Sequence, residues 1–124
     1  MIGKFCLAAA ALMISASPVL AASCSNPIAP AQIDGSKATE QQMKDAIGDF
    51  KSFEQASDDY QTCLLDDLKQ QKLEAAKAKD PKPLDPSIEQ GVTAKVDANQ
   101  RLKEKIGAEL NASIAAYKQA HPKS

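Results

Sequence analysis

The chain has 124 residues, 15 basic and 16 acidic, and its net charge of −1 offers no electrostatic reason to bind nucleic acid or an anionic membrane. It holds no tryptophan, three phenylalanines and two tyrosines, too few aromatic side chains to line a large apolar ligand pocket. This length allows one modest domain.

Residues 1–22 have the three parts of a secretory signal peptide. Lys4 is the only charged residue before Asp34 and forms the positive start, and an apolar run of 12 residues over 5–16 follows it. That run has the length of a signal peptide's hydrophobic region and is too short to span a membrane. Small residues at 21 and 22 suit the peptidase, so we expect cleavage there and a periplasmic or secreted bacterial protein.

The segment over 23–38 is expected to be extended. Pro27 and Pro30 push the residues before them out of the helical region, and no helical period runs through the stretch. Residues 34–36 (Asp-Gly-Ser) have the composition of a turn. This Pro-rich segment leads directly into the first predicted helix.

Two cysteines remain once the signal peptide, which contains Cys6, has been removed. In an oxidising compartment Cys24 and Cys63 most simply form one disulfide. The bond would close a loop of about 40 residues, which the chain-entropy model values at roughly 4 kcal/mol of folding free energy. An alternative stays open, because residues 21–24 (Ala-Ala-Ser-Cys) are also similar to a bacterial lipoprotein box. A lipid on Cys24 would exclude the disulfide.

Two amphipathic helices are expected next, over 39–79 and 86–120. A Thr-x-x-Gln capping box opens the first at Thr39, and Asp85, followed by a proline, caps the second. Three prolines within 80–86 end the first helix and stiffen the connection.

A short, stiff connection between two long helices predicts an antiparallel hairpin, so the expected fold is all-α, with packing like that of a coiled coil. Folding the chain at the prolines brings together positions whose numbers sum to roughly 165, such as Leu102 with Leu64 and Ile106 with Tyr60. Asn99 lies on or beside the apolar stripe. A polar residue there can fix the register or the oligomeric state, or simply mark the edge of the stripe.

The disulfide also dictates the path of the N-terminal segment. Cys63 lies about 24 residues into the first helix, roughly 36 Å from its start, and the residues between Cys24 and Thr39 can span up to about 50 Å. The segment must therefore double back along the helix. We expect three of its residues to cover the flank of the first helix beside Cys63: Pro27, Ile28 and Ile33.

No group of residues has the pattern of a catalytic, cofactor or metal site. The one histidine, His121, falls within 121–124, which we expect to be a disordered tail, and Cys63 has no histidine to activate it. The densest carboxylates are two Asp-Asp pairs, at 58–59 and 66–67. A helix face paired with lysines explains them better than calcium, which needs a loop that wraps oxygens around the ion. We therefore expect no enzyme activity, no cofactor and no metal.

Four short motifs lie between the two cysteines or include the second: Pro27-x-x-Pro30, Ile33-Asp34-Gly35, Ala38-Thr39 with Met43 following, and Tyr60-x-x-Cys63-Leu64. Together they resemble a group of small exported proteins from alphaproteobacteria. The resemblance covers residues 24–64 best and fades in the second helix. It implies the exported compartment and the disulfide, and it implies no activity.

Two long helical faces predict a non-enzymatic protein that acts by binding an unidentified protein partner. Two helices bury little area, so a homodimer that forms a four-helix bundle is a second expectation. The alternative function is a lipid-anchored envelope component modified at Cys24. No nucleic acid is expected as a partner, and no membrane unless Cys24 is lipidated.

Overall fold

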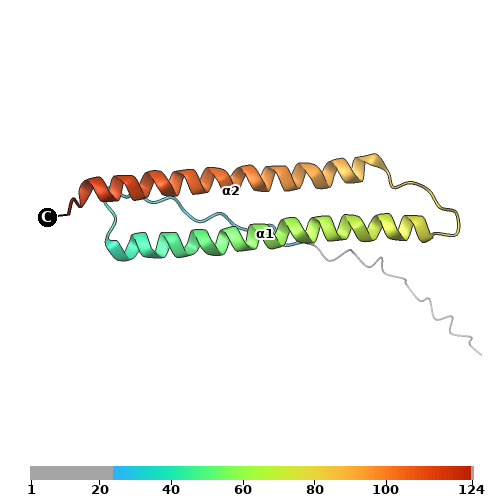
Figure 1. Cartoon of the computed structure of the whole chain (residues 1–124), viewed down its shortest axis with the longest axis horizontal. Helices are drawn as coiled ribbons and strands as arrows, with labels where there is room; N and C mark the ends of the chain where they lie inside the picture. Colours follow the sequence, from blue (N-terminus) through green and yellow to red (C-terminus); the bar gives the residue numbers. More distant parts are fainter. Residues whose placement is uncertain (1–23, 124) are drawn as a thin grey trace, which may run out of the picture.

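The computed structural model describes residues 24–123, so the predicted signal peptide over 1–22 lies outside the described residues. Two long helices, α1 (Glu40–Lys77) and α2 (Pro86–Ala120), lie antiparallel and side by side (Figure 1). The part of the chain that the structure describes has no strand, and neither of its helices is apolar enough over a sufficient length to cross a membrane. The predicted helical hairpin is confirmed.

Local signals place the helix starts where the sequence predicts them. The Thr39 hydroxyl accepts a hydrogen bond from the backbone N–H of Gln42, and the Gln42 side-chain oxygen accepts one from the backbone N–H of Thr39. This reciprocal pair is a complete capping box at the start of α1. Asp85 caps α2 by accepting a hydrogen bond from the N–H of Ser87, with Pro86 as the first helical residue.

The end of α1 falls at Lys77, two residues before the predicted end. Pro81 has no N–H to donate to the carbonyl of Lys77, and its ring would collide with that carbonyl in a continued helix. Ala78 is accordingly extended, with a ψ of 153°. The connection that follows is closed at its base by an ion pair between the helices, from Lys72 to Glu89 at 3.0 Å.

The core between the helices is small. Among the described residues, six apolar side chains are buried: Ala38, Met43, Phe53, Leu64, Leu68 and Ile106. Leu65, on the same helix as four of them, keeps 51% of its surface exposed. A fully buried large side chain stabilises a fold by about 1.5–3 kcal/mol, and only five of these six are large. The hairpin therefore depends on further contacts beyond this core.

The register differs from the predicted one by about one helical turn. Gln61 donates a hydrogen bond to Asn99, and Asp58 pairs with Lys103, so contacting positions sum to 160 and 161. The predicted sum of roughly 165 is wrong by about one turn of 3.6 residues. A slide of one turn returns the same apolar stripe to the interface, so the hydrophobic pattern does not separate the two registers.

A buried polar cluster selects the observed register. Ser57 is fully buried and Asn99 is 5% exposed. The Asn99 amide donates to the Ser57 hydroxyl at 3.4 Å, and Gln61 Nε2 donates to Asn99 Oδ1 at 2.8 Å. A slide by one turn would leave these groups buried without partners, at a cost of about 1–3 kcal/mol for each group. Asn99 therefore fixes the register within the hairpin, one of the roles that the sequence left open.

The predicted disulfide between Cys24 and Cys63 is present, with 5.7 Å between their Cα atoms. From there the N-terminal segment doubles back between the helices towards the C-terminal end of α2 before it enters α1 (Figure 1). It therefore contacts both helices and not the flank of α1 alone, and Ser113 of α2 donates a hydrogen bond to the carbonyl oxygen of Ile33 at 2.7 Å. Ile28, which we expected to be covered, is 92% exposed, so that part of the prediction is wrong.

Gly35 lies directly against the backbone of α2. A Cβ atom on this residue would lie 1.7 Å from the carbonyl oxygen of Ser113 and 3.0 Å from the backbone nitrogen of Tyr117. No described glycine has a positive φ, so Gly35 is required for space and not for a left-handed backbone. The predicted turn is present, with the carbonyl oxygen of Asp34 accepting from the N–H of Lys37 at 3.1 Å.

Candidate functional site

The two helices form a groove on each side of their contact, and the N-terminal segment fills only one of them. On the covered side the space that remains near Ala46, Ile106 and Ser113 is about 10 Å³. On the other side two hollows of about 630 and 590 Å³ adjoin, because both are lined by Ile47 and Ile114. We call these two adjoining hollows the open groove.

Consecutive residues of each helix divide the two sides. The covered side is lined by Ala46, Ile106 and Ser113, and the open groove by the residue that follows each of them: Ile47, Gly107 and Ile114. Consecutive residues of a helix point 100° apart, which separates the two sets. Phe50 and Leu110 line both sides and form the floor between them.

Gly107 allows the aromatic floor of the open groove to lie close to α2. A Cβ atom at this position would lie 3.2 Å from Cζ of Phe50, closer than ordinary van der Waals contact. The Phe50 ring therefore occupies the space that a larger residue at 107 would need. The result is a groove with an aliphatic and aromatic floor, a composition that suits burial against another apolar surface.

The rim of the open groove is charged unevenly along its length. At the end formed by the start of α1 and the end of α2, the hollow is bordered by three lysines and one carboxylate: Lys44, Lys118, Lys123 and Glu40. In the adjoining hollow the rim carries Glu54 and Glu104. The groove is therefore mostly basic at one end and richer in carboxylates further along.

Two of the rim lysines are committed to ion pairs within the chain. Lys44 contacts Glu40 at 2.7 Å, and this hydrogen-bonded pair lowers the pKa of Glu40 and raises the pKa of Lys44. Lys103, on the wall of the second hollow, pairs with Asp58 across the helix contact.

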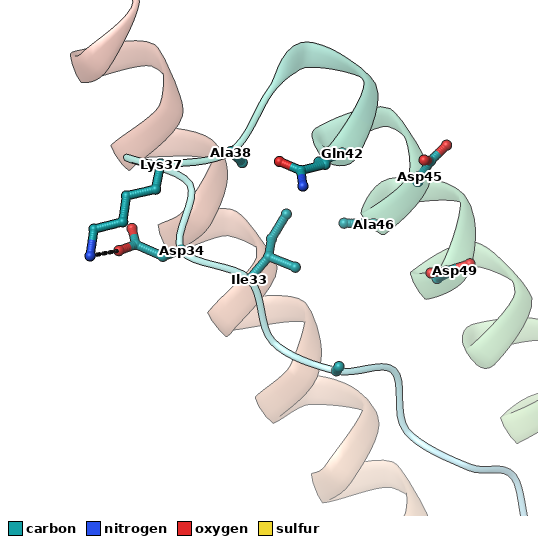
Figure 2. A pocket seen from close by; sticks show the side chains of 9 residues that line it. Ile33, Asp34, Lys37, Ala38, Gln42, Asp45, Ala46 and Asp49 are labelled. Atoms are coloured by element: carbon teal, nitrogen blue, oxygen red, sulfur yellow. Dashed lines mark ion pairs between the residues drawn. The ribbon is translucent and has the colours of Figure 1, made fainter.

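A third hollow, of about 440 Å³, lies between the N-terminal segment and α1. Figure 2 shows Ile33 pointing from the segment towards α1, with the Lys37–Asp34 ion pair on the side away from α1. The Ser36 hydroxyl and backbone N–H both donate to the Asp34 carboxylate, which lowers its pKa. Gln42 is occupied by the capping box. Because these polar groups are already bonded within the chain, we assign this hollow no ligand.

Three of the four aspartates in the Asp-Asp pairs at 58–59 and 66–67 make contacts with other side chains. Asp58 pairs with Lys103 of α2, as expected of a helix face opposite lysines. Asp59 and Asp67 each accept a hydrogen bond from a glutamine four residues away on the same helix. Within residues 24–123 no group of three or more His, Cys, Asp or Glu side chains is placed to hold a metal ion.

His121, which we expected in a disordered tail, lies at the end of the open groove. Its ring stacks on Tyr117 with 4.3 Å between the ring centroids, and its backbone N–H donates to the Tyr117 carbonyl oxygen at 3.0 Å. The stack extends the aromatic floor at the basic end. The four-residue spacing between Tyr117 and the residue that caps α2 was the signal that could have predicted this stack.

Comparison with protein-family models, with curated proteins and with solved structures found no match for this chain. The resemblance to small exported proteins therefore stays a prediction, and the proposals below depend on the chain's own residues.

Proposed function

We propose that the protein is an exported, non-enzymatic interaction protein that binds another protein through the open groove. The observation that carries the proposal is the pair of adjoining hollows, about 630 and 590 Å³, whereas only about 10 Å³ remains where the N-terminal segment packs against both helices on the other side. The N-terminal segment illustrates how such a groove is filled, since an extended stretch of this chain closes the covered side. The open groove offers a similar apolar floor to a segment from outside the hairpin.

The proposed compartment is the bacterial periplasm or the medium. Disulfides persist in oxidising compartments outside the cytoplasm, and residues 1–22 have the sequence features of a secretory signal peptide. The disulfide also disfavours the alternative of a lipid anchor. A lipid thioether would need the Cys24 sulfur, which is bonded to Cys63.

Two of the groups able to transfer protons are engaged in contacts within the chain, which supports a non-enzymatic role. Asp58 is paired with Lys103, and the ring of His121 is stacked on Tyr117. The open groove presents mainly apolar area between charged rims, the composition of a protein-binding surface.

Site-specific photo-crosslinking in cells that export the protein tests this function. Ala108, exposed on the wall of the open groove, is replaced by a photoreactive aromatic amino acid. Ala94, exposed on the same helix and outside the groove, carries the same group as the matched control. We expect a discrete protein adduct from position 108 and none from position 94. No adduct from 108, or equal labelling from both, contradicts the proposal.

A further inference from the structure

We infer that the occupant of the open groove is a second copy of this chain, packed face to face and antiparallel about a two-fold axis. The axis crosses the hairpin, perpendicular to the helices, at the level of residues 49 and 111. The inference depends on the proposed function, because it names the partner of the same groove. Two antiparallel hairpins packed in this way form a four-helix bundle with an isologous interface.

The rim charges of α1 define one midpoint. Lys44 lies at the basic end of the open groove and Glu54 lies further along the same helix, so residue 49 is midway between them. About an axis at that level, α1 of one copy runs antiparallel to α1 of the other. Lys44 of each copy then faces Glu54 of the other, so that this contact is made twice.

The rim charges of α2 define a second midpoint independently. Lys118 lies at the basic end and Glu104 lines the adjoining hollow, so residue 111 is midway between them. In the same antiparallel arrangement Lys118 of each copy faces Glu104 of the other. Opposite charges placed in this way favour one docking register over its alternatives.

The two midpoints lie at the same level of the hairpin. Gln61 contacts Asn99 across the helices, so positions whose numbers sum to 160 lie opposite one another, and 49 and 111 also sum to 160. A single axis therefore places both Lys–Glu pairs opposite one another at once. Nothing in the packing within one hairpin requires this agreement, because it concerns exposed residues on the rims.

The same axis brings compatible side chains together near the centre of the groove. On α2, Ile114 faces Ala108 of the second copy, and Asn111 faces its own equivalent, where two amides can hydrogen-bond. A small residue opposite a large one lets the helices approach closely. Glu40 and Asp58 oppose one another at the edge. Asp58 keeps its pair with Lys103, and Lys44 lies between Glu40 of its own chain and Glu54 of the second copy.

Sedimentation equilibrium of the exported, disulfide-intact protein from micromolar to millimolar concentration tests the inference. We expect the mass to rise with concentration to twice that of one chain. Lys118→Glu and Glu104→Lys should each weaken the dimer about tenfold, because each contact occurs twice in a symmetric pair. The double variant Lys118→Glu/Glu104→Lys exchanges the two charges and should restore association, which also shows that the single variants are not merely unfolded.

Lys95→Glu is the control for the change in net charge. Lys95 is exposed on α2 but lies beyond the reach of the second copy's α2 in this arrangement. We expect it to leave association unchanged. A protein that stays monomeric at millimolar concentration overturns the inference. A double variant that associates no better than the single variants also overturns it. A monomer that still gives an adduct from position 108 with a different protein overturns self-association alone and leaves the proposed function standing.

Discussion

Replacing Gly35 by alanine tests how the N-terminal segment is seated on α2. The added Cβ would lie 1.7 Å from the carbonyl oxygen of Ser113, whereas ordinary van der Waals contact begins near 3.4 Å. The segment must therefore move away by about 1.7 Å, because the opposing atom belongs to the helix backbone and has no rotamer that avoids the contact.

The expected loss is the sum of two effects. Displacement breaks the hydrogen bond from Ser113 to the carbonyl oxygen of Ile33, worth about 0.5–1.5 kcal/mol. It also loosens the packing of the segment, and overpacking of this kind costs typically about 1–3 kcal/mol. We expect Gly35→Ala to lower the free energy of unfolding by about 1.5–4.5 kcal/mol.

Urea unfolding followed by far-UV circular dichroism measures the effect, with Gly48→Ala as the matched control. Gly48 is exposed within α1 and nothing lies within 4 Å of a Cβ placed there, so alanine should stabilise the helix by about 0.5–1 kcal/mol. Without a clash, Gly35→Ala would also be stabilising, because alanine has less conformational freedom in the unfolded chain. A Gly35→Ala protein as stable as the wild type refutes the proposed seating of the segment.

Three further predictions follow from the same contacts. Replacing both Cys24 and Cys63 by serine should reduce the free energy of unfolding by roughly 4 kcal/mol, and an unchanged urea midpoint would contradict this. Asn99→Ala should lower the free energy of unfolding by about 1–3 kcal/mol in the same assay, because Ser57 and Gln61 lose their partner. Asn99→Leu combined with Ser57→Ala should lower it less. Equal losses in the two proteins would argue against the polar cluster. Hydrogen bonds lower the pKa values of three carboxyl groups: Asp34 accepts from Ser36, Glu40 from Lys44 and Asp85 from the N–H of Ser87. These carboxylates therefore stabilise the fold at neutral pH. The stabilisation is lost as the pH falls below the ordinary pKa values, 3.8 for the two aspartates and 4.5 for Glu40. Urea midpoints measured against pH should fall on acidification, less steeply in Asp85→Asn, and a midpoint that rises would contradict the assignment.

The helix starts were predictable because their causes are local. The capping box at Thr39 and the Asp-Pro start of α2 each act within a few residues, and the sequence alone shows them. The disulfide was predictable for a different reason, since two cysteines in an oxidising compartment have one simple pairing. These features depend on no knowledge of how the helices pack.

The register and the open groove could not be predicted, because both depend on tertiary contacts. An apolar stripe fits its partner equally well after a slide of one turn, and only the burial of Asn99 beside Ser57 decides between the two positions. The N-terminal segment covers the side of the hairpin on which Cys63 and the close approach at Gly35 lie, and the sequence shows Gly35 only as a turn residue. That choice leaves Ile28 exposed and the opposite groove open.

The central claim is that the mature protein is a helical hairpin, linked by a disulfide to its N-terminal segment and located outside the cytoplasm. The intact mass of the protein from its native host, measured with and without reduction before thiol alkylation, tests this claim most directly. We predict the mass of a chain whose first residue is Ala22 or Ser23, with two thiols that are alkylated only after reduction. A heavier mass with acyl chains on Cys24 and a thiol at Cys63 that is free without reduction would contradict it.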